Sequence, residues 1–334
     1  MTRQLAAMPQ TRAGRGGIER PCHLKEMFIT SSGDVFPCCL TWNRPEMKIG
    51  HIADPDIDAR IAAFDATCRC SSFAFRKATH GDVQDYKLNI EFSLICNGEC
   101  AMCCVDAPAR QRPYAYYDEL QRFADSLPSI NHMVAQGGEV LIQKKTLDWI
   151  RTFRREKPEI PIGIITNGNV APGMASEVET LFDNVLISFY GFQPETYTRI
   201  SGLSLETARR FAGEIVARKK TTVHLKYLIT PLNIHEANLF LQWAVNLGPE
   251  TISIIDSWIP QYINRDTSDG YWDKIIERTG EAVRGVISAS SEKIRSRGIV
   301  ILIDAMARTM FGIEDSFINE TGLAGRILPN PMVG

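Results

Sequence analysis

Three cysteines stand within eight residues, in the run Cys96-Asn97-Gly98-Glu99-Cys100-Ala101-Met102-Cys103. This C-x3-C-x2-C spacing follows directly on an apolar stretch, residues 88–95. Three soft thiolates with no fourth partner fixed by the spacing suit a cubic iron–sulfur cluster that keeps one iron open. An open iron can bind a substrate or a cofactor. The run therefore predicts a chemical site as well as a structural one.

The remaining cysteines extend the case for metal binding. All nine lie between residues 22 and 104, and no cysteine follows. A disulfide framework would not usually crowd cysteines in this way. They form two groups. The first is Cys96, Cys100, Cys103 and the adjacent Cys104, and the second is Cys22, Cys38, Cys39, Cys68 and Cys70.

Composition sets broad limits on the function. The apolar and charged fractions, 44% and 23%, are ordinary for a globular protein, and the formal net charge is −2. This balance gives no global attraction to nucleic acid or to an anionic membrane, and no apolar run is long enough to span a bilayer. The first twenty residues contain four arginines and no apolar core, so we expect a flexible arm and not a secretory signal. We therefore expect a cytoplasmic protein with neither nucleic acid nor membrane as partner.

Strands and helices are predicted to alternate along residues 89–256. Helical spacing of apolar residues marks, for example, 118–127 and the helix that Ser204 would cap. Short apolar runs mark six strands, which are residues 89–95, 131–136, 162–166, 185–190, 222–230 and 251–256. Six such units in series predict an α/β fold with a parallel sheet. After them we expect a helix over 272–296, a possible extra strand over 298–305, and a tail.

The unusual residues fall where these strands end. They are the cysteine run, Gly137-Gly138-Glu139, Thr166-Asn167-Gly168 and Ser188-Phe189-Tyr190-Gly191. Parallel sheets place their chemistry at the carboxyl ends of the strands. We therefore expect these residues to converge at one end of the sheet, which we call its mouth. Further side chains near strand ends could act as a base or a substrate anchor, and these are Tyr190, Lys226, Tyr227, Asp256 and Trp258.

On these motifs, residues 87–256 resemble the radical SAM superfamily, whose members are built on a partial (β/α)6 barrel with parallel strands. The resemblance implies that Cys96, Cys100 and Cys103 hold a site-differentiated [4Fe-4S] cluster. It also implies that Gly137, Gly138 and Glu139 hold the amino group of S-adenosylmethionine, although Val140 replaces the family's proline. The residues implied to contact the ribose or the carboxylate of that cofactor are Asn167, Ser188 and Arg199.

The resemblance implies a definite chemistry. The cluster passes one electron to the bound sulfonium, and the cleaved cofactor gives a 5′-deoxyadenosyl radical that removes hydrogen from an unactivated carbon. The cofactors carry the difficult step, while the protein supplies orientation and a dry cavity. An electron donor such as flavodoxin or ferredoxin is implied as a partner.

A second module is predicted before the barrel. Residues 28–38 indicate a hairpin around Ser32-Gly33-Asp34, and Cys68-Arg69-Cys70 follows after a turn and a short helix. This stretch resembles the SPASM or twitch module, which carries an auxiliary iron–sulfur cluster, although that module usually follows the barrel. The implied ligands are Cys22, Cys38, Cys68 and Cys70, with Cys39 as an alternative. A [4Fe-4S] cluster, a [2Fe-2S] cluster and structural zinc remain open.

The predicted organisation has four parts. These are a flexible arm over 1–20, an auxiliary-cluster module over 21–84, the partial barrel over 85–260 and a C-terminal region over 261–334. The predicted function is a radical SAM enzyme that oxidises or cross-links a peptide or small polar substrate with help from the auxiliary cluster. One alternative is a redox-neutral epimerase with Cys104 as hydrogen donor. The other is a non-catalytic iron–sulfur or zinc scaffold or sensor.

Overall fold

The computed structural model describes residues 26–39, 41–65, 86–127, 129–256 and 271–329. Their centre is one eleven-stranded sheet in the order β11-β10-β9-β8-β7-β6-β5-β4-β1-β2-β3. Strands β1 and β4 to β11 are joined by parallel pairing, and only β2 and β3 are antiparallel to their neighbours. The strands are β1 Glu26–Ile29, β2 Asp34–Phe36, β3 Gly50–His51, β4 Tyr86–Glu91, β5 Ile130–Gln136, β6 Ile162–Thr166, β7 Asn184–Phe189, β8 Thr222–Ile229, β9 Thr251–Asp256, β10 Val300–Ile303 and β11 Ile327–Pro329.

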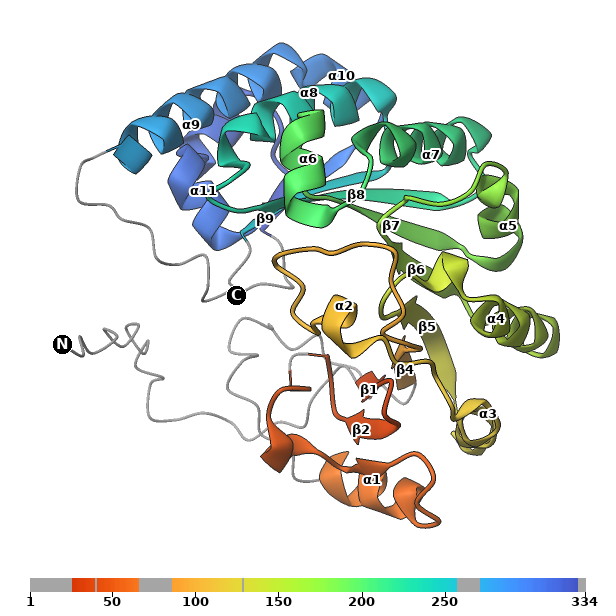
Figure 1. The fold of residues 1–334 in the computed structure, drawn as a ribbon. Coiled ribbons are helices and arrows are strands. Elements are labelled where there is room, and N and C mark those ends of the chain that lie inside the picture. Colours follow the sequence, from red (N-terminus) through yellow and green to blue (C-terminus); the bar gives the residue numbers. More distant parts are fainter. Residues whose placement is uncertain (1–25, 40, 66–85, 128, 257–270, 330–334) are drawn as a thin grey trace, which may run out of the picture.

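The sheet is strongly curved, and the larger helices lie along its outer side (Figure 1). The α-helices are α1 Ile57–Asp65, α2 Ala107–Arg110, α3 Tyr117–Ser126, α4 Lys144–Glu156, α5 Met174–Leu181, α6 Pro194–Ser201, α7 Leu205–Arg218, α8 Ala237–Leu247, α9 Tyr271–Ala289, α10 Ser291–Ser296, α11 Ala305–Phe311 and α12 Asp315–Glu320. Short 3-10 turns occupy Pro45–Met47, Val140–Ile142 and Ile234–Glu236. The segment that carries α2 crosses the concave side of the sheet (Figure 1). This arrangement confirms the predicted α/β class.

Side chains alternate between the two faces of the sheet. In β8, Val223, Leu225 and Tyr227 are buried in the core against the helices. The residues between them, His224 and Lys226, are only half-buried. Because successive side chains in a strand point to opposite faces, these two lie on the concave face. The concave face is thus the wall of the barrel, and part of it is polar.

Most of the predicted helices and strands are confirmed, and the structure differs from the prediction at three places. The first barrel strand ends at Glu91 and not at Ile95, because residues 93–95 leave the ladder and bond to other loops: Leu94 N donates to Arg112 O (2.8 Å). The helix expected over 272–296 is two helices, α9 and α10, separated at Ser290. The tail after Asn319 adds a strand, β11, which pairs with β10.

The predicted hairpin is confirmed as β1 and β2, with Phe28 opposite Phe36. It does not stand apart from the barrel. Strand β1 pairs in parallel with β4 over four residue pairs, from Glu26 with Lys87 to Ile29 with Ile90. The N-terminal module therefore shares the barrel's sheet.

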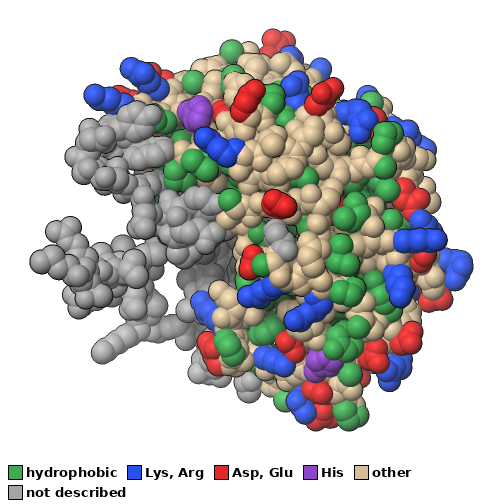
Figure 2. All heavy atoms as spheres, in the orientation of Figure 1, with side chains coloured by type: hydrophobic (Ala, Val, Ile, Leu, Met, Phe, Trp, Pro, Cys, Tyr) green, Lys and Arg blue, Asp and Glu red, His purple; other side chains and the backbone are tan. Residues whose placement is uncertain are grey.

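Charges are mixed on the surface. Figure 2 shows Lys and Arg interspersed with Asp and Glu over the described part of the visible face. Across the described residues, every helix is either too short or too polar to span a lipid bilayer.

The shared sheet predicts that the hairpin supports the barrel. Ile29 on β1 is fully buried beside Ile90. We expect Ile29→Ala to lower the free energy of unfolding by about 2–4 kcal/mol, because it leaves a cavity at the junction. The measurement is urea unfolding followed by far-UV circular dichroism. Ile142→Ala removes the same atoms from a side chain that is 44% exposed and should change little. Equal effects of the two variants would contradict the prediction.

Candidate active site

The loop that carries the first cysteine group, residues 92–106, is held at two places by backbone hydrogen bonds. On one side, Gly138 N donates to Ser93 O (2.6 Å) and Glu139 N donates to Ile95 O (2.9 Å). On the other side, residues 99 and 101 donate to the last carbonyls of α6, at Ser201 O and Ile200 O (both 2.8 Å). The loop is therefore fixed between the end of β5 and the end of α6.

The three predicted cluster ligands come together in this loop. Cys96, Cys100 and Cys103 are each half-buried. Burial and then the thiols of Cys96 and Cys103 raise the pKa of Cys100 to about 12. Backbone N–H groups point at two of the sulfurs, from Gly98 to Cys96 Sγ and from Ala107 to Cys103 Sγ (both 3.4 Å).

Such N–H groups stabilise thiolates, so the donor set fits an iron–sulfur cluster bound by three cysteines. Among the described residues, no three His, Cys, Asp or Glu side chains are gathered closely enough to hold a single metal ion.

The two glycines before Glu139 are explained by close backbone approach. A Cβ on Gly137 would lie 2.3 Å from Ser93 O, and one on Gly138 would lie 2.1 Å from Ile95 O. Gly137 also has a φ of +138°, which side chains other than glycine rarely adopt. Any larger residue would push the cysteine loop away from β5. The glycines thus position both the loop and the carboxylate that follows them.

Glu139 is fully buried, and its carboxylate accepts three hydrogen bonds. Leu141 N (3.1 Å) and Thr166 Oγ1 (2.8 Å) donate to Oε1, and Asn167 N (2.8 Å) donates to Oε2. Burial raises the pKa of this carboxyl, and the hydrogen bonds oppose the rise. Within the described residues no Lys, Arg or His forms an ion pair with it. A buried carboxylate without a protein cation fits an ammonium group supplied by a ligand.

Asn167 connects the carboxylate to the cysteine loop. Besides its backbone bond to Glu139, its Nδ2 donates to Asn97 Oδ1 (2.9 Å) and lies 4.0 Å from Cys96 Sγ. Asn97 in turn donates to Asn169 O (2.7 Å). Of the residues predicted to touch S-adenosylmethionine, Gly137, Gly138, Glu139 and Asn167 therefore lie together.

Ser188 also lies in this region, because it is buried on β7 beside Tyr190. The hydroxyl of Tyr190 is in turn a neighbour of the Cys100 thiol. Arg199 differs, because it is exposed on α6. Its helix ends against the cysteine loop, but among the described residues Arg199 forms no ion pair.

Sequence reasoning missed Asn169 and gave Thr166 no role beyond its place at the end of a strand. Thr166 donates its hydroxyl hydrogen bond to Glu139, and Asn169 joins the cysteine loop to α7 by accepting from Asn97 through its carbonyl oxygen and from Ser204 N through Oδ1 (2.8 Å). Both flank Asn167 at the end of β6, so the polar run Thr166-Asn167-Gly168-Asn169 was the available signal. Their partners are distant in sequence, which is why the run alone did not reveal them.

The second cysteine group is described only in part. Cys22, Cys68 and Cys70 lie outside the described residues. Cys38 is buried just after β2. Cys39 N donates to Glu26 Oε1 (3.2 Å), at the start of β1. Burial and then the Glu26 carboxylate raise the pKa of the Cys39 thiol to about 12.

Cys38 and Cys39 therefore lie at the opposite end of the strands from Cys96. Cys38 and Cys39 are near the amino ends of β1 and β4, and Cys96 follows the carboxyl end of β4. Strand β4 has six residues, which corresponds to a length of roughly 20 Å.

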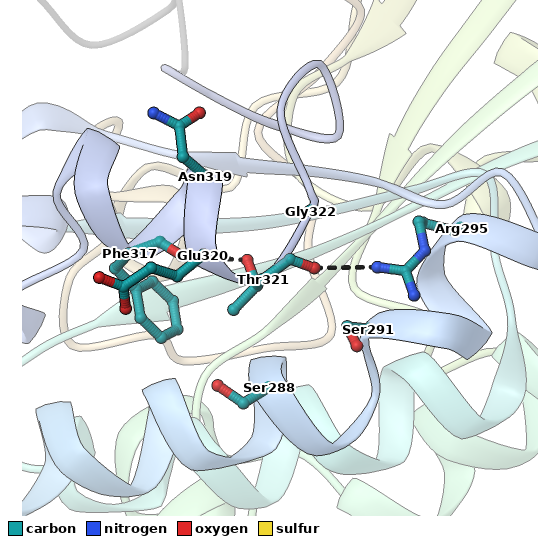
Figure 3. A pocket seen from close by; sticks show the side chains of 8 residues that line it. All are labelled: Ser288, Ser291, Arg295, Phe317, Asn319, Glu320, Thr321 and Gly322. Carbon is teal, nitrogen blue, oxygen red and sulfur yellow. Dashed lines mark hydrogen bonds between the residues drawn. The ribbon is translucent and has the colours of Figure 1, made fainter.

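A separate cavity of about 540 Å³ lies among α9, α10 and the segment around α12 (Figure 3). Arg295 points across it and donates to Thr321 O (2.9 Å). Its lining contains none of the predicted site residues.

Comparison with known proteins defines the class. Residues 90–244 match the model of the radical SAM superfamily. Residues 22–83 match the SPASM model, described as an iron–sulfur cluster-binding domain. The chain therefore carries a radical SAM domain with a SPASM domain on its N-terminal side. The radical SAM domain implies a [4Fe-4S] cluster and S-adenosylmethionine, and the SPASM domain implies auxiliary iron–sulfur clusters.

Individual relatives match only in part. A GTP 3′,8-cyclase from Paenarthrobacter nicotinovorans is 31% identical over 126 residues, which are 34% of this chain and 33% of that protein. The match thus spans about a third of that curated relative. Among solved structures, Streptococcus suis SuiB bound to S-adenosylmethionine is 13% identical with a TM-score of 0.49, covering 70% of this chain and 54% of SuiB. The structure of anSMEcpe with bound AdoMet is 16% identical with a TM-score of 0.48, covering 65% and 63%.

The glycine contacts give a direct test of the site. We expect Gly138→Ala to lower the iron content of the anaerobically reconstituted protein by at least half, because the new Cβ displaces the loop that carries Cys96. Iron and sulfide counting measures this. The control is Gly213→Ala in α7, where a Cβ meets nothing within 4 Å and improves helix propensity. Full iron content in Gly138→Ala would show that the close approach does not position the cluster loop.

Proposed function

We propose that this protein cleaves S-adenosylmethionine reductively to a 5′-deoxyadenosyl radical, which abstracts hydrogen from a peptide or small polar substrate. The auxiliary cluster of the SPASM domain then supports net oxidation or bond formation by accepting an electron. A small electron-transfer protein such as flavodoxin or ferredoxin supplies the first electron.

One observation carries this proposal. Asn167 joins the loop that carries Cys96, Cys100 and Cys103 to a buried carboxylate that no cation of the described residues pairs with. A structural metal centre has no need of that carboxylate. A cofactor with an ammonium group that also reaches the cluster needs both.

The chain's residues have separable roles in this proposal. Cys96, Cys100 and Cys103 bind the cluster, and Glu139 binds the ammonium group of the cofactor. Asn167 and Ser188 orient its ribose or carboxylate from the wall of the barrel, and Arg199 does so from α6. When bound, the cluster and the cofactor together supply the radical. The curved sheet and the loop that crosses it limit access of water to that radical.

The first test uses the reconstituted protein without any substrate. With S-adenosylmethionine and dithionite in the absence of oxygen, we expect slow formation of 5′-deoxyadenosine, detected by mass spectrometry. Cys96→Ala should reduce it to background, because the cluster loses one of its three protein ligands. Cys104→Ala removes the neighbouring thiol and should retain it. No 5′-deoxyadenosine from the wild-type protein, at full iron content, would contradict the proposed function.

A second test separates the two clusters. We expect Cys38→Ala to lower the iron content from about eight to about four per chain, or from about six if the auxiliary cluster has two irons. Formation of 5′-deoxyadenosine without substrate should persist, because Cys38 lies at the other end of the strands from Cys96. Cys39→Ala is the matched variant. If Cys39→Ala loses the auxiliary iron and Cys38→Ala does not, Cys39 is the ligand and Cys38 is not.

A further inference from the structure

One lysine on the concave face of the sheet, Lys226, forms no ion pair with a carboxylate of the described residues. Lys226 lies in β8, in register with Ser188 on β7 and with Ser253 on β9. It is therefore at the same level of the barrel wall as Ser188, one of the residues proposed to orient the cofactor. Its side chain is half-buried.

The groups around Lys226 are already engaged or uncharged. Ser253 Oγ hydrogen-bonds His224 Nε2 (2.8 Å), and burial lowers the pKa of His224 to about 4, so this imidazole is neutral. The thiol of Cys104, an exposed residue, is a further neighbour of the ammonium. Within the described residues, no carboxylate forms an ion pair with Lys226.

The acidic groups of the mouth have other partners. Glu91 accepts a hydrogen bond from Ser31 N (2.9 Å) and lies near Arg110 and Arg112. Glu139 accepts three hydrogen bonds, from Leu141 N, Thr166 Oγ1 and Asn167 N. Lys226 therefore keeps a charge that neither carboxylate neutralises.

Holding an ammonium in this position is unfavourable without an anion. Burial lowers the pKa of Lys226 to about 8, which records the cost of removing the charge from water. An apolar residue would fit a barrel wall that also contains Leu186 and Leu228. Unfavourable charges of this kind are typical of positions that serve binding.

We propose that Lys226 binds an anionic group of the substrate, a carboxylate or a phosphate, and so fixes the substrate beside the cofactor. This inference rests on the proposed function, because it places the substrate in the mouth of the same barrel. It narrows the substrate class from any peptide or polar molecule to one that carries a negative charge near the reacting carbon.

Binding of small probes to the holoenzyme tests this proposal. The protein is reconstituted, loaded with S-adenosylmethionine and titrated calorimetrically at low ionic strength. One arm compares N-acetylglutamate with its neutral analogue N-acetylglutamine, and the other compares ribose 5-phosphate with ribose. We expect the charged member of one pair to bind at least about tenfold more tightly, and the arm that shows this identifies the anion.

Variants then assign the preference to one residue. Lys226→Met should abolish the preference for the charged probe, and Lys226→Arg should retain most of it. Lys145→Met, at an exposed lysine in α4, should leave the preference intact. The melting temperature of Lys226→Met should equal or exceed that of the wild type, because a desolvated charge has been removed. A preference that survives in Lys226→Met would overturn the proposal.

Two further measurements, of Lys226 acetylation and of S-adenosylmethionine affinity, complete the test. In the wild-type protein, the charged probe should slow acetylation of Lys226 by an amine-reactive reagent about tenfold, read by peptide mass spectrometry, and the neutral probe should not. No protection would overturn the proposal. A tenfold loss of S-adenosylmethionine affinity in Lys226→Met would also overturn it, because the lysine would then serve the cofactor. Absence of 5′-deoxyadenosine from the wild type, with the charge preference intact, would instead count against the proposed function alone.

Discussion

The site depends on one close contact between two pieces of backbone. The end of β5 passes so near the loop after β4 that Gly137 and Gly138 cannot carry a side chain. Two hydrogen bonds join the segments there, from Gly138 N to Ser93 O and from Glu139 N to Ile95 O. This contact sets the position of Cys96 and of the Glu139 carboxylate together. A change in either segment would therefore move both Cys96 and the Glu139 carboxylate.

Two charges that the described residues leave unpaired are explained if each binds a ligand group of opposite charge. Glu139 is buried with three hydrogen-bond donors and no cation among the described residues. Lys226 stands on another strand of the same sheet, and no carboxylate of the described residues pairs with it. Each charge is unfavourable for the empty protein, and each becomes favourable when a group of opposite charge enters. In the proposed function, the negative and the positive group would together orient a cofactor and a substrate relative to each other.

The parallel pairing of β1 with β4 explains how a cluster-binding module can precede the barrel. Because β1 extends the barrel's own sheet at the edge next to its first strand, the hairpin needs no separate docking surface. The antiparallel return of β2 carries Cys38 back toward the amino ends of the strands. Cys38 is thereby held at the opposite end of the shared sheet from Cys96.

The sequence by itself determined the kinds of groups at the site and the elements that carry them. The cysteine spacing, Gly137-Gly138-Glu139 and the apolar runs are local patterns, so the α/β class and the helices and strands could be read directly, and the three cluster thiols could be predicted. The tertiary structure decided what depends on distant partners. Only the fold showed that β1 joins β4, that Thr166 and Asn169 hydrogen-bond with Glu139 and the cysteine loop, that Arg199 is exposed, and that no carboxylate among the described residues pairs with Lys226. Those facts depend on strand register and burial, which arise when segments far apart in the chain pack together.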